Sequence, residues 1–342
     1  MIHSNGIQVA RGIAAVLVVL YHASVWSGDY YETVYNDFFN FGEIGVDFFF
    51  VLSGFLIFYL HRGDDRGWAA WKKYFMKRLI RIYPPFLPVS LVLLFFYLNY
   101  PDLPNGGRTI GIVSSIFLIP SGGAPALVIS WTLMHEMLFY AFFSLYFFCR
   151  RCFFVFTAIW IVLICARINT VENSYLLSFL LNVHNLEFFF GVAVALAADA
   201  YNKSHTLFLT AGILLIVLFI MASYFNVQYP PVLQGDVIFI YLGLAFACIV
   251  YGLYGLDING TVRYPSFLLF LGVASYSIYL VHFPLLSVFN RIAALLYPQI
   301  IPYQQLLFFS IVALCTAAGL LYHLLWEKRV NGYLKRTFIV SS

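Results

Sequence analysis

Long apolar runs follow one another along almost the whole chain, with short polar connections between them. Apolar runs of about 17–25 residues match the ~30 Å hydrocarbon core of a bilayer when they are helical. Only helices and closed barrels satisfy the backbone in lipid, and these runs lack the polar alternation of a barrel strand. The pattern therefore predicts transmembrane helices at 7–26, 44–60, 82–99, 130–148, 152–170, 176–198, 206–225, 236–254, 266–288 and 303–326.

These runs indicate an all-α, polytopic membrane protein with about ten transmembrane helices. No soluble appendage, internal repeat or low-complexity tract interrupts them, so residues 1–342 are expected to form a single transmembrane domain. We interpret the first run as a helix and not as a cleaved signal peptide, because Arg11 lies inside its helical pattern. The apolar stretch 110–119 is too short to span and is expected to be re-entrant or to lie on the surface.

Basic residues concentrate in alternate connections, which sets the expected orientation. The segment 61–81 contains seven Lys and Arg residues, the turn at 149–152 contains two, and the segment 327–342 contains four. Short loops rich in Lys and Arg stay on the cytoplasmic side of a membrane. With ten spans, these segments all fall on one side, and both termini are predicted to be cytoplasmic. A multi-pass membrane protein fits this pattern.

The composition excludes several classes of protein. Of the 342 residues, 62% are hydrophobic and only 10% are charged, whereas a soluble domain carries about 25% charged residues. A soluble enzyme, a disordered chain and a nucleic-acid binder are therefore excluded, and membrane lipids are the expected surroundings. The five cysteines lie in or beside apolar runs, and Cys149 and Cys152 form a lone CxxC. We expect thiols at these positions, with no disulfide framework and no metal site.

Arg11 and His22 are ionisable residues within the first predicted helix. Eleven residues at about 100° each give about 20° more than three full turns, so both side chains lie on one face, about 16 Å apart along the axis. Ionisable groups at membrane depth usually face a bundle interior or a water-filled cavity. Alternatively, Arg11 extends to the lipid headgroups and His22 caps the outer end of the helix.

The next two predicted helices begin with charged residues. Asp47 is a carboxylate near the start of the second helix, where it either orients His22 or Arg11 or simply favours the positive end of the helix dipole. Arg78 and Arg81 lie three residues apart at the cytoplasmic end of the third helix. Such a pair can grip phosphates through bidentate hydrogen bonds, or it can serve as ordinary positive-inside anchoring.

Two further helices carry polar stripes. Thr132, Glu136 and Tyr140 recur every four residues after Trp131, and an intramembrane glutamate usually marks a functional site. Ser275, Tyr279 and His282 share one face of the ninth predicted helix. Interhelical hydrogen bonding that holds the bundle together is an equally good interpretation of the second stripe.

In these motifs the chain resembles the acyltransferase-3 family of bacterial integral-membrane carbohydrate O-acyltransferases. The resemblance covers nearly the whole chain and rests on five motifs in the family's order. They are Arg11 and His22 with ten residues between them, the run Gly45–Phe55, the run Arg78–Pro84, the run Ser130–Leu133 followed by Glu136, Phe139 and Tyr140, and the run Ser275–His282. The chain is similar to the stand-alone members, which lack a C-terminal esterase-like domain.

The resemblance implies a membrane-bound enzyme that transfers an acyl group, with acetyl expected, from cytoplasmic acyl-coenzyme A to a carbohydrate hydroxyl. The expected acceptor is an exopolysaccharide, an O-antigen or a lipid-linked glycan unit. The acyl-CoA is a donor substrate, and no bound cofactor is expected. The alternative is a transporter or exporter of a polysaccharide precursor that uses a buried Arg, His and Glu relay.

Acyl transfer to a sugar requires a base, a group that stabilises the oxyanion, and two aligned substrates. We assign His22 as the base that acts on the sugar hydroxyl, or alternatively as a transiently acylated residue. Arg11 is expected to hold the thioester region, and Glu136 and Asp47 are candidates for orienting His22. Glu136 alternatively contacts the acceptor. Residues expected to bind the donor are Arg78, Arg81 and Ser53, and those expected to bind or support the acceptor are Trp131, Tyr140, Ser275, Tyr279 and His282.

Overall fold

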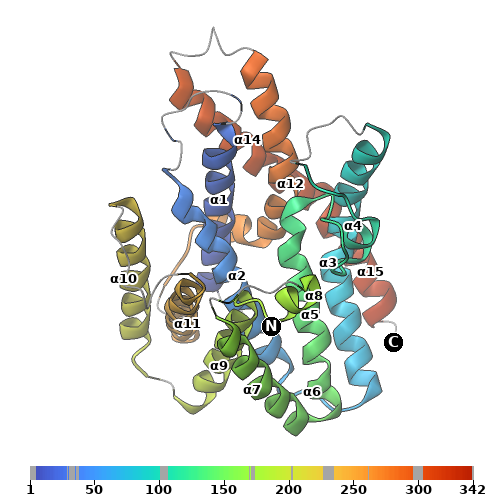
Figure 1. Ribbon diagram of the computed structural model, residues 1–342. Helices are drawn as coiled ribbons and strands as arrows, with labels where there is room; N and C mark the ends of the chain where they lie inside the picture. Colours follow the sequence, from blue (N-terminus) through green and yellow to red (C-terminus); the bar gives the residue numbers. More distant parts are fainter. Residues whose placement is uncertain are drawn as a thin grey trace. The chain divides into compact units, whose positions relative to one another are not determined.

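The computed structural model describes residues 5–28, 30, 35, 38–100, 107–168, 170, 174–201, 203–225, 235–260, 262–295 and 303–340. Over these residues the chain forms helices and no strand, which confirms the all-α class (Figure 1). The helices are α1 (Asn5–Ser27), α2 (Gly45–His61), α3 (Trp68–Asn99), α4 (Ile112–Phe117), α5 (Trp131–Phe143), α6 (Leu145–Phe148), α7 (Arg150–Arg167), α8 (Tyr175–Leu180), α9 (His184–Ala200), α10 (His205–Tyr224), α11 (Val237–Ile258), α12 (Ser266–Leu295), α14 (Gln304–Tyr322) and α15 (Lys328–Lys335).

Among the described residues, nine helical segments are long and apolar enough to cross a membrane, which confirms a polytopic membrane protein. The remaining predicted run, 152–170, forms α7, whose 18 residues include Arg150, Arg151 and Arg167. Two helices extend beyond the predicted runs. Helix α3 begins at Trp68, because the basic segment before the predicted span is itself helical. The last run continues through a π-helical turn, His323–Glu327, into α15.

The contacts of the chain divide it into two compact units, and each is described by itself. The first unit comprises Met1–Leu60 and Glu187–His323, and the second comprises His61–Leu186 and Leu324–Ser342. The first unit contains α1, α10, α11, α12, α14 and most of α2 and α9, and the second contains α3 to α8 and α15. That the whole chain forms one domain stays a prediction.

In the first unit, α1 and α12 pack side by side at glycines. A Cβ atom added to Gly12 would lie 2.9 Å from the backbone nitrogen of Gly272, and one added to Gly272 would overlap the carbonyl of Gln8. Small residues of this kind let two membrane helices approach closely. The two helices are parallel, because Gln8 lies opposite Gly272 while His22, further along α1, lies opposite His282.

The start of α1 is held by the last turn of α11. Both carboxylate oxygens of Asp257 accept from the backbone N–H of Gly6, at 3.0 Å each. A negative charge here compensates the positive end of the helix dipole. Burial and the nearby charge of Asp257 also raise the pKa of the Tyr264 hydroxyl, which lies in the connection after α11.

The direction of the helices in the first unit bears on the number of membrane crossings. Helices α2 and α11 are also parallel, since Phe48 packs on Phe246 and Tyr59, further along, bonds to Tyr254. Four of the nine apolar segments separate α2 from α11 in the chain, and four crossings would make the pair antiparallel. A fifth crossing restores the parallel direction, and α7 is the described helix whose length fits it. The tenth crossing predicted from the sequence therefore has support, while the side that holds the termini stays a prediction.

In the second unit, the end of the chain completes the hydrogen bonding of α3. This helix contains Pro84, Pro85 and Pro88. Because Pro88 has no N–H, the carbonyl of Pro84 receives no helical hydrogen bond from that position. The indole N–H of Trp326 donates to this carbonyl at 2.8 Å. The segment after α14 is therefore packed against α3 and is not a loose tail.

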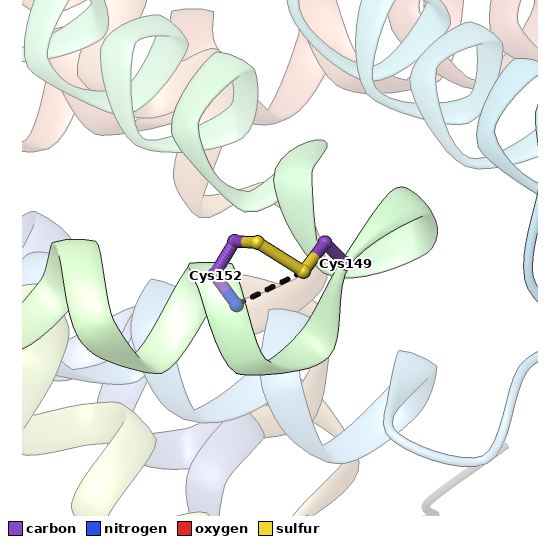
Figure 2. Close-up of a disulfide and its surroundings, with 2 residues drawn as sticks. All are labelled: Cys149 and Cys152. Carbon is purple, nitrogen blue, oxygen red and sulfur yellow. Dashed lines mark hydrogen bonds between the residues drawn. A yellow bond between two sulfur atoms is a disulfide. The ribbon is translucent and has the colours of Figure 1, made fainter.

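The expectation of two free thiols at the CxxC is wrong. The structure joins Cys149 to Cys152 by a disulfide, as Figure 2 shows. Cys149 lies directly before α7, and its sulfur also accepts from the backbone N–H of Cys152 at 3.1 Å. The start of the helix brings the two Cα atoms to 5.2 Å, which is within the range of disulfides. Three cysteines of the described residues stay free, namely Cys165, Cys248 and Cys315.

Candidate functional site

Arg11 and His22 both face α12 from α1, so they share one helix face, as the helical periodicity predicted. One guanidinium nitrogen of Arg11 (Nη2) donates to the Ser275 hydroxyl at 3.1 Å, and the other (Nη1) donates to the Gln8 side chain at 3.0 Å. Ser275 is fully buried on α12. The structure therefore places the guanidinium of Arg11 and the imidazole of His22 in the same interface, between α1 and α12.

The imidazole of His22 is oriented by a second imidazole. Its Nδ1 lies 3.1 Å from Nε2 of His282 and 3.0 Å from the carbonyl of Val18. Nδ1 of His282 lies 3.1 Å from the carbonyl of Ile278, one turn earlier on α12. The ring of Tyr279 packs on His282, which is fully buried. Two residues that the sequence grouped as acceptor or support positions, Ser275 and His282, thus contact Arg11 and His22, and the third, Tyr279, packs on His282.

Asp47 is paired with Glu187 in the first unit. Both side chains are buried, and one carboxylate oxygen of each lies within 4.8 Å of the other. The pair lies where α2 and α9 approach closely, since a Cβ added to Gly54 would overlap the backbone of Phe188. Two such carboxylates are also the ligand type that cations prefer.

Ser53 lies on α2 directly before Gly54 and is half-buried. It belongs to the first unit together with Arg11, His22 and Asp47. The expected donor-binding arginines, Arg78 and Arg81, belong to the second unit.

Arg78 is held at the start of the second unit by aromatic rings and a histidine. Its guanidinium carbon lies 5.9 Å from the ring centre of Tyr74 and 5.8 Å from that of Tyr140. Its Nη2 lies 3.3 Å from Nε2 of His61. An arginine only donates, so Nε2 of His61 accepts, and its Nδ1–H is free to donate to Asp64 at 2.7 Å.

Arg81 forms an ion pair with the segment after α14. Its Nη1 lies 2.5 Å from a carboxylate oxygen of Glu327, whose side chain is 3% exposed while that of Arg81 is 30% exposed. Lys335 lies within electrostatic range of Arg78, Arg81 and Glu327. The cationic cluster, defined as Lys77, Arg78, Arg81 and Lys335, therefore combines α3 with α15 around one acidic residue.

Glu136 and Trp131 lie on α5 in the second unit. The hydroxyl of Tyr140 donates a hydrogen bond to the carboxylate of Glu136, which lies one helical turn earlier on α5. This bond holds the carboxylate in one orientation. The ring of Trp131 lies 5.4 Å from that of His184 and keeps 37% of its surface exposed. His135, the residue before Glu136, bonds to Asn185 at 2.9 Å and has a packing role.

Three residues that lie against the predicted site residues were given no site role from the sequence, namely Glu187, Glu327 and His61. Glu187 lies within a predicted span, where an acidic residue was a sufficient signal. Glu327 lies one residue beyond the predicted end of the last run, so it was interpreted as part of a tail. His61 ends α2 and carried no signal beyond its residue type.

Comparisons with known proteins agree over most of the chain. The family model described as "Acyltransferase domain", of the acyltransferase-3 family, matches residues 4–323. The exopolysaccharide production protein ExoZ of Rhizobium meliloti (strain 1021) is 29% identical over 283 residues, which cover 77% of this chain and 80% of the relative. The acyltransferase MdmB of Streptomyces mycarofaciens is 33% identical over 114 residues, covering 31% of this chain and 28% of the relative. No solved structure matches the chain.

Proposed function

The chain belongs to the acyltransferase-3 family, and we propose that it transfers an acyl group, with acetyl expected, from acyl-coenzyme A to a carbohydrate hydroxyl. The name of the relative ExoZ, an exopolysaccharide production protein, supports a polysaccharide or its lipid-linked precursor as the acceptor. We place the protein in the bacterial cytoplasmic membrane, with the donor entering from the cytosol. The basic segments at 61–81 and 327–342 support this orientation.

The contact between α1 and α12 carries the proposal. His22 and Arg11 face the same partner helix, with His282 and Ser275 as their respective partners. In the proposed reaction, a ring nitrogen of His22 takes the proton of the sugar hydroxyl, and the sugar oxygen attacks the thioester carbon. The carbon–sulfur bond then breaks, and the thiolate takes the proton back from His22. Arg11 stabilises the negative charge that develops on the thioester oxygen.

The cationic cluster is the proposed site for the donor phosphates. Arg78 lies between two aromatic rings that restrict its side chain, so less entropy is lost when it binds a phosphate. Arg81 and Lys335 add charge, and Glu327 holds the Arg81 guanidinium in one orientation. Ser53 is retained as a proposed donor-binding residue.

The remaining predicted residues have proposed roles in acceptor binding and orientation. The exposed face of Trp131 offers a surface on which a sugar ring can stack. Glu136, fixed by Tyr140, is proposed to accept a hydrogen bond from the acceptor or to orient the base. Asp47 and Glu187 are proposed to support the bundle around the site, where α2 and α9 bring their buried carboxyl groups close together.

The test uses purified protein in lipid vesicles with radiolabelled acetyl-CoA and the host polysaccharide. We expect His22→Ala to lose transfer by at least about 100-fold, as general-base loss does. His205→Ala removes a buried histidine of the same unit, away from the contact between α1 and α12, and serves as the matched control. Normal transfer by a folded His22→Ala protein would end the assignment. Movement of a labelled precursor across the vesicle without any acyl transfer would favour a transporter.

A further inference from the structure

The hydrogen bonds around His22 determine which of its ring nitrogens carries a proton. Nδ1 of His22 lies 3.0 Å from the carbonyl of Val18, and Nδ1 of His282 lies 3.1 Å from the carbonyl of Ile278. A carbonyl oxygen only accepts hydrogen bonds, so both Nδ1 atoms carry hydrogen. Each ring is thus tied to the backbone one helical turn before it.

The contact between the two rings agrees with this assignment. A neutral His282 with hydrogen on Nδ1 has a lone pair on Nε2, and this atom lies 3.1 Å from Nδ1 of His22. The Nδ1–H of His22 therefore donates to His282 as well as to Val18. The other tautomer of His22 would direct its Nδ1 lone pair at the Val18 carbonyl and at the His282 lone pair. Adding a proton to His282 to relieve this clash would place a charge on a fully buried ring.

From this geometry we propose that His282 is a positioning residue, which holds His22 in the tautomer with a bare, basic Nε2. The inference rests on the proposed function, because it supplies the atom that accepts the proton of the sugar hydroxyl. When Nε2 takes that proton, the resulting cation keeps two acceptors at Nδ1, the Val18 carbonyl and His282 Nε2. The proton then leaves from Nε2 to the thiolate, and both rings return to their starting state.

This role requires an acceptor at one position of the His282 side chain and does not depend on its bulk. Gln places its Oε1 about where the histidine has Nε2, so His282→Gln keeps an acceptor for the Nδ1–H of His22. Leu is apolar and of similar size, so His282→Leu fills the space without an acceptor. The Val18 carbonyl stays in both variants, so the loss in His282→Leu is partial.

The direct test is ¹⁵N NMR of protein labelled at histidine, because ring nitrogens with and without hydrogen have well-separated chemical shifts. The signals of His22 are assigned by their absence in His22→Gln. In the unsubstituted protein we expect a protonated Nδ1 and a bare Nε2 on His22. In His282→Leu we expect a mixture of both tautomers, and in His282→Gln the original state. A protonated Nε2 on His22 of the neutral, unsubstituted protein would overturn the proposal without the need for any variant.

Kinetics give a second readout that simple loss of packing would not produce. We expect His282→Leu to lower kcat by about 10–100-fold, as loss of a group that orients a catalytic residue does, with little change in KM for acetyl-CoA. His282→Gln should restore most of that loss. Equal kcat values in His282→Leu and the unsubstituted protein would refute the role. If His22→Ala keeps transfer while the NMR state is as expected, the proposed function fails and the tautomer assignment stands.

Discussion

The ion pair between Arg81 and Glu327 predicts unequal effects when its two partners are replaced. Arg81→Met takes the contacting guanidinium from a carboxylate that is 3% exposed and leaves only the more distant charge of Lys335, which costs about 3–5 kcal/mol. Glu327→Gln leaves an arginine that is 30% exposed and reaches solvent, so the cost falls to about 1 kcal/mol. The double variant has no stranded charge and should lose only about 1–2 kcal/mol. The two single effects are then non-additive by at least about 2 kcal/mol.

Thermal unfolding of the purified protein, followed by tryptophan fluorescence, measures this order. We expect Arg81→Met to unfold at the lowest temperature, the double variant next, and Glu327→Gln closest to the unsubstituted protein. Equal shifts in the single variants, or additive shifts in the double, would refute the argument from burial. Acetyl-CoA binding separates stability from function. Under the proposed donor site, Arg81→Met weakens binding strongly, and Glu327→Gln weakens it less because the glutamine still offers the guanidinium an acceptor. Unchanged binding in both variants would make Arg81 an anchor only.

Two other predictions follow from the fold and one from the distribution of basic residues. Gly272→Leu should destabilise the protein by more than about 3 kcal/mol or prevent its insertion, because the new side chain would overlap the backbone of α1. The control Gly332→Leu meets open space and should unfold at nearly the normal temperature. Similar unfolding temperatures of the two variants would contradict the close approach of α1 and α12. Thiol labelling of denatured protein should find three reactive cysteines without reductant and five with it, and five without reductant would show that Cys149 and Cys152 are not bonded. A fluorescent protein fused to the C-terminus should fold in the cytoplasm, and an active alkaline phosphatase at the same position would place that end outside.

The apolar pattern predicted the helices well because lipid imposes length and composition on a span. It did not predict where helices end beyond the hydrocarbon core of the bilayer. Hydropathy indicates which residues are surrounded by lipid, but a helix can continue into the aqueous region. Helix α3 begins at Trp68 among basic residues, and the helical segment after α14 continues well past residue 326, for this reason. Whether α7 crosses the membrane was harder to judge, because its 18 residues include three arginines.

The partners of the predicted site residues were the part that the sequence did not reveal. Periodicity placed Arg11 and His22 on one face, but their partners on α12 lie more than 250 residues away in the chain. Such pairs depend on which helices pack together and at what register. The candidates for orienting His22 were carboxylates, while the structure supplies a second imidazole. The disulfide was missed because it depends on backbone geometry at the start of one helix.

The hydrogen bond from Trp326 to Pro84 bears on where the protein can safely be shortened. The family match ends at residue 323, only three positions before Trp326. A version trimmed at that boundary would lack both the indole that serves the Pro84 carbonyl and the carboxylate that serves Arg81. Affinity tags and fusion partners therefore belong beyond residue 340, because the helical turns before it help to complete a membrane helix that begins at Trp68.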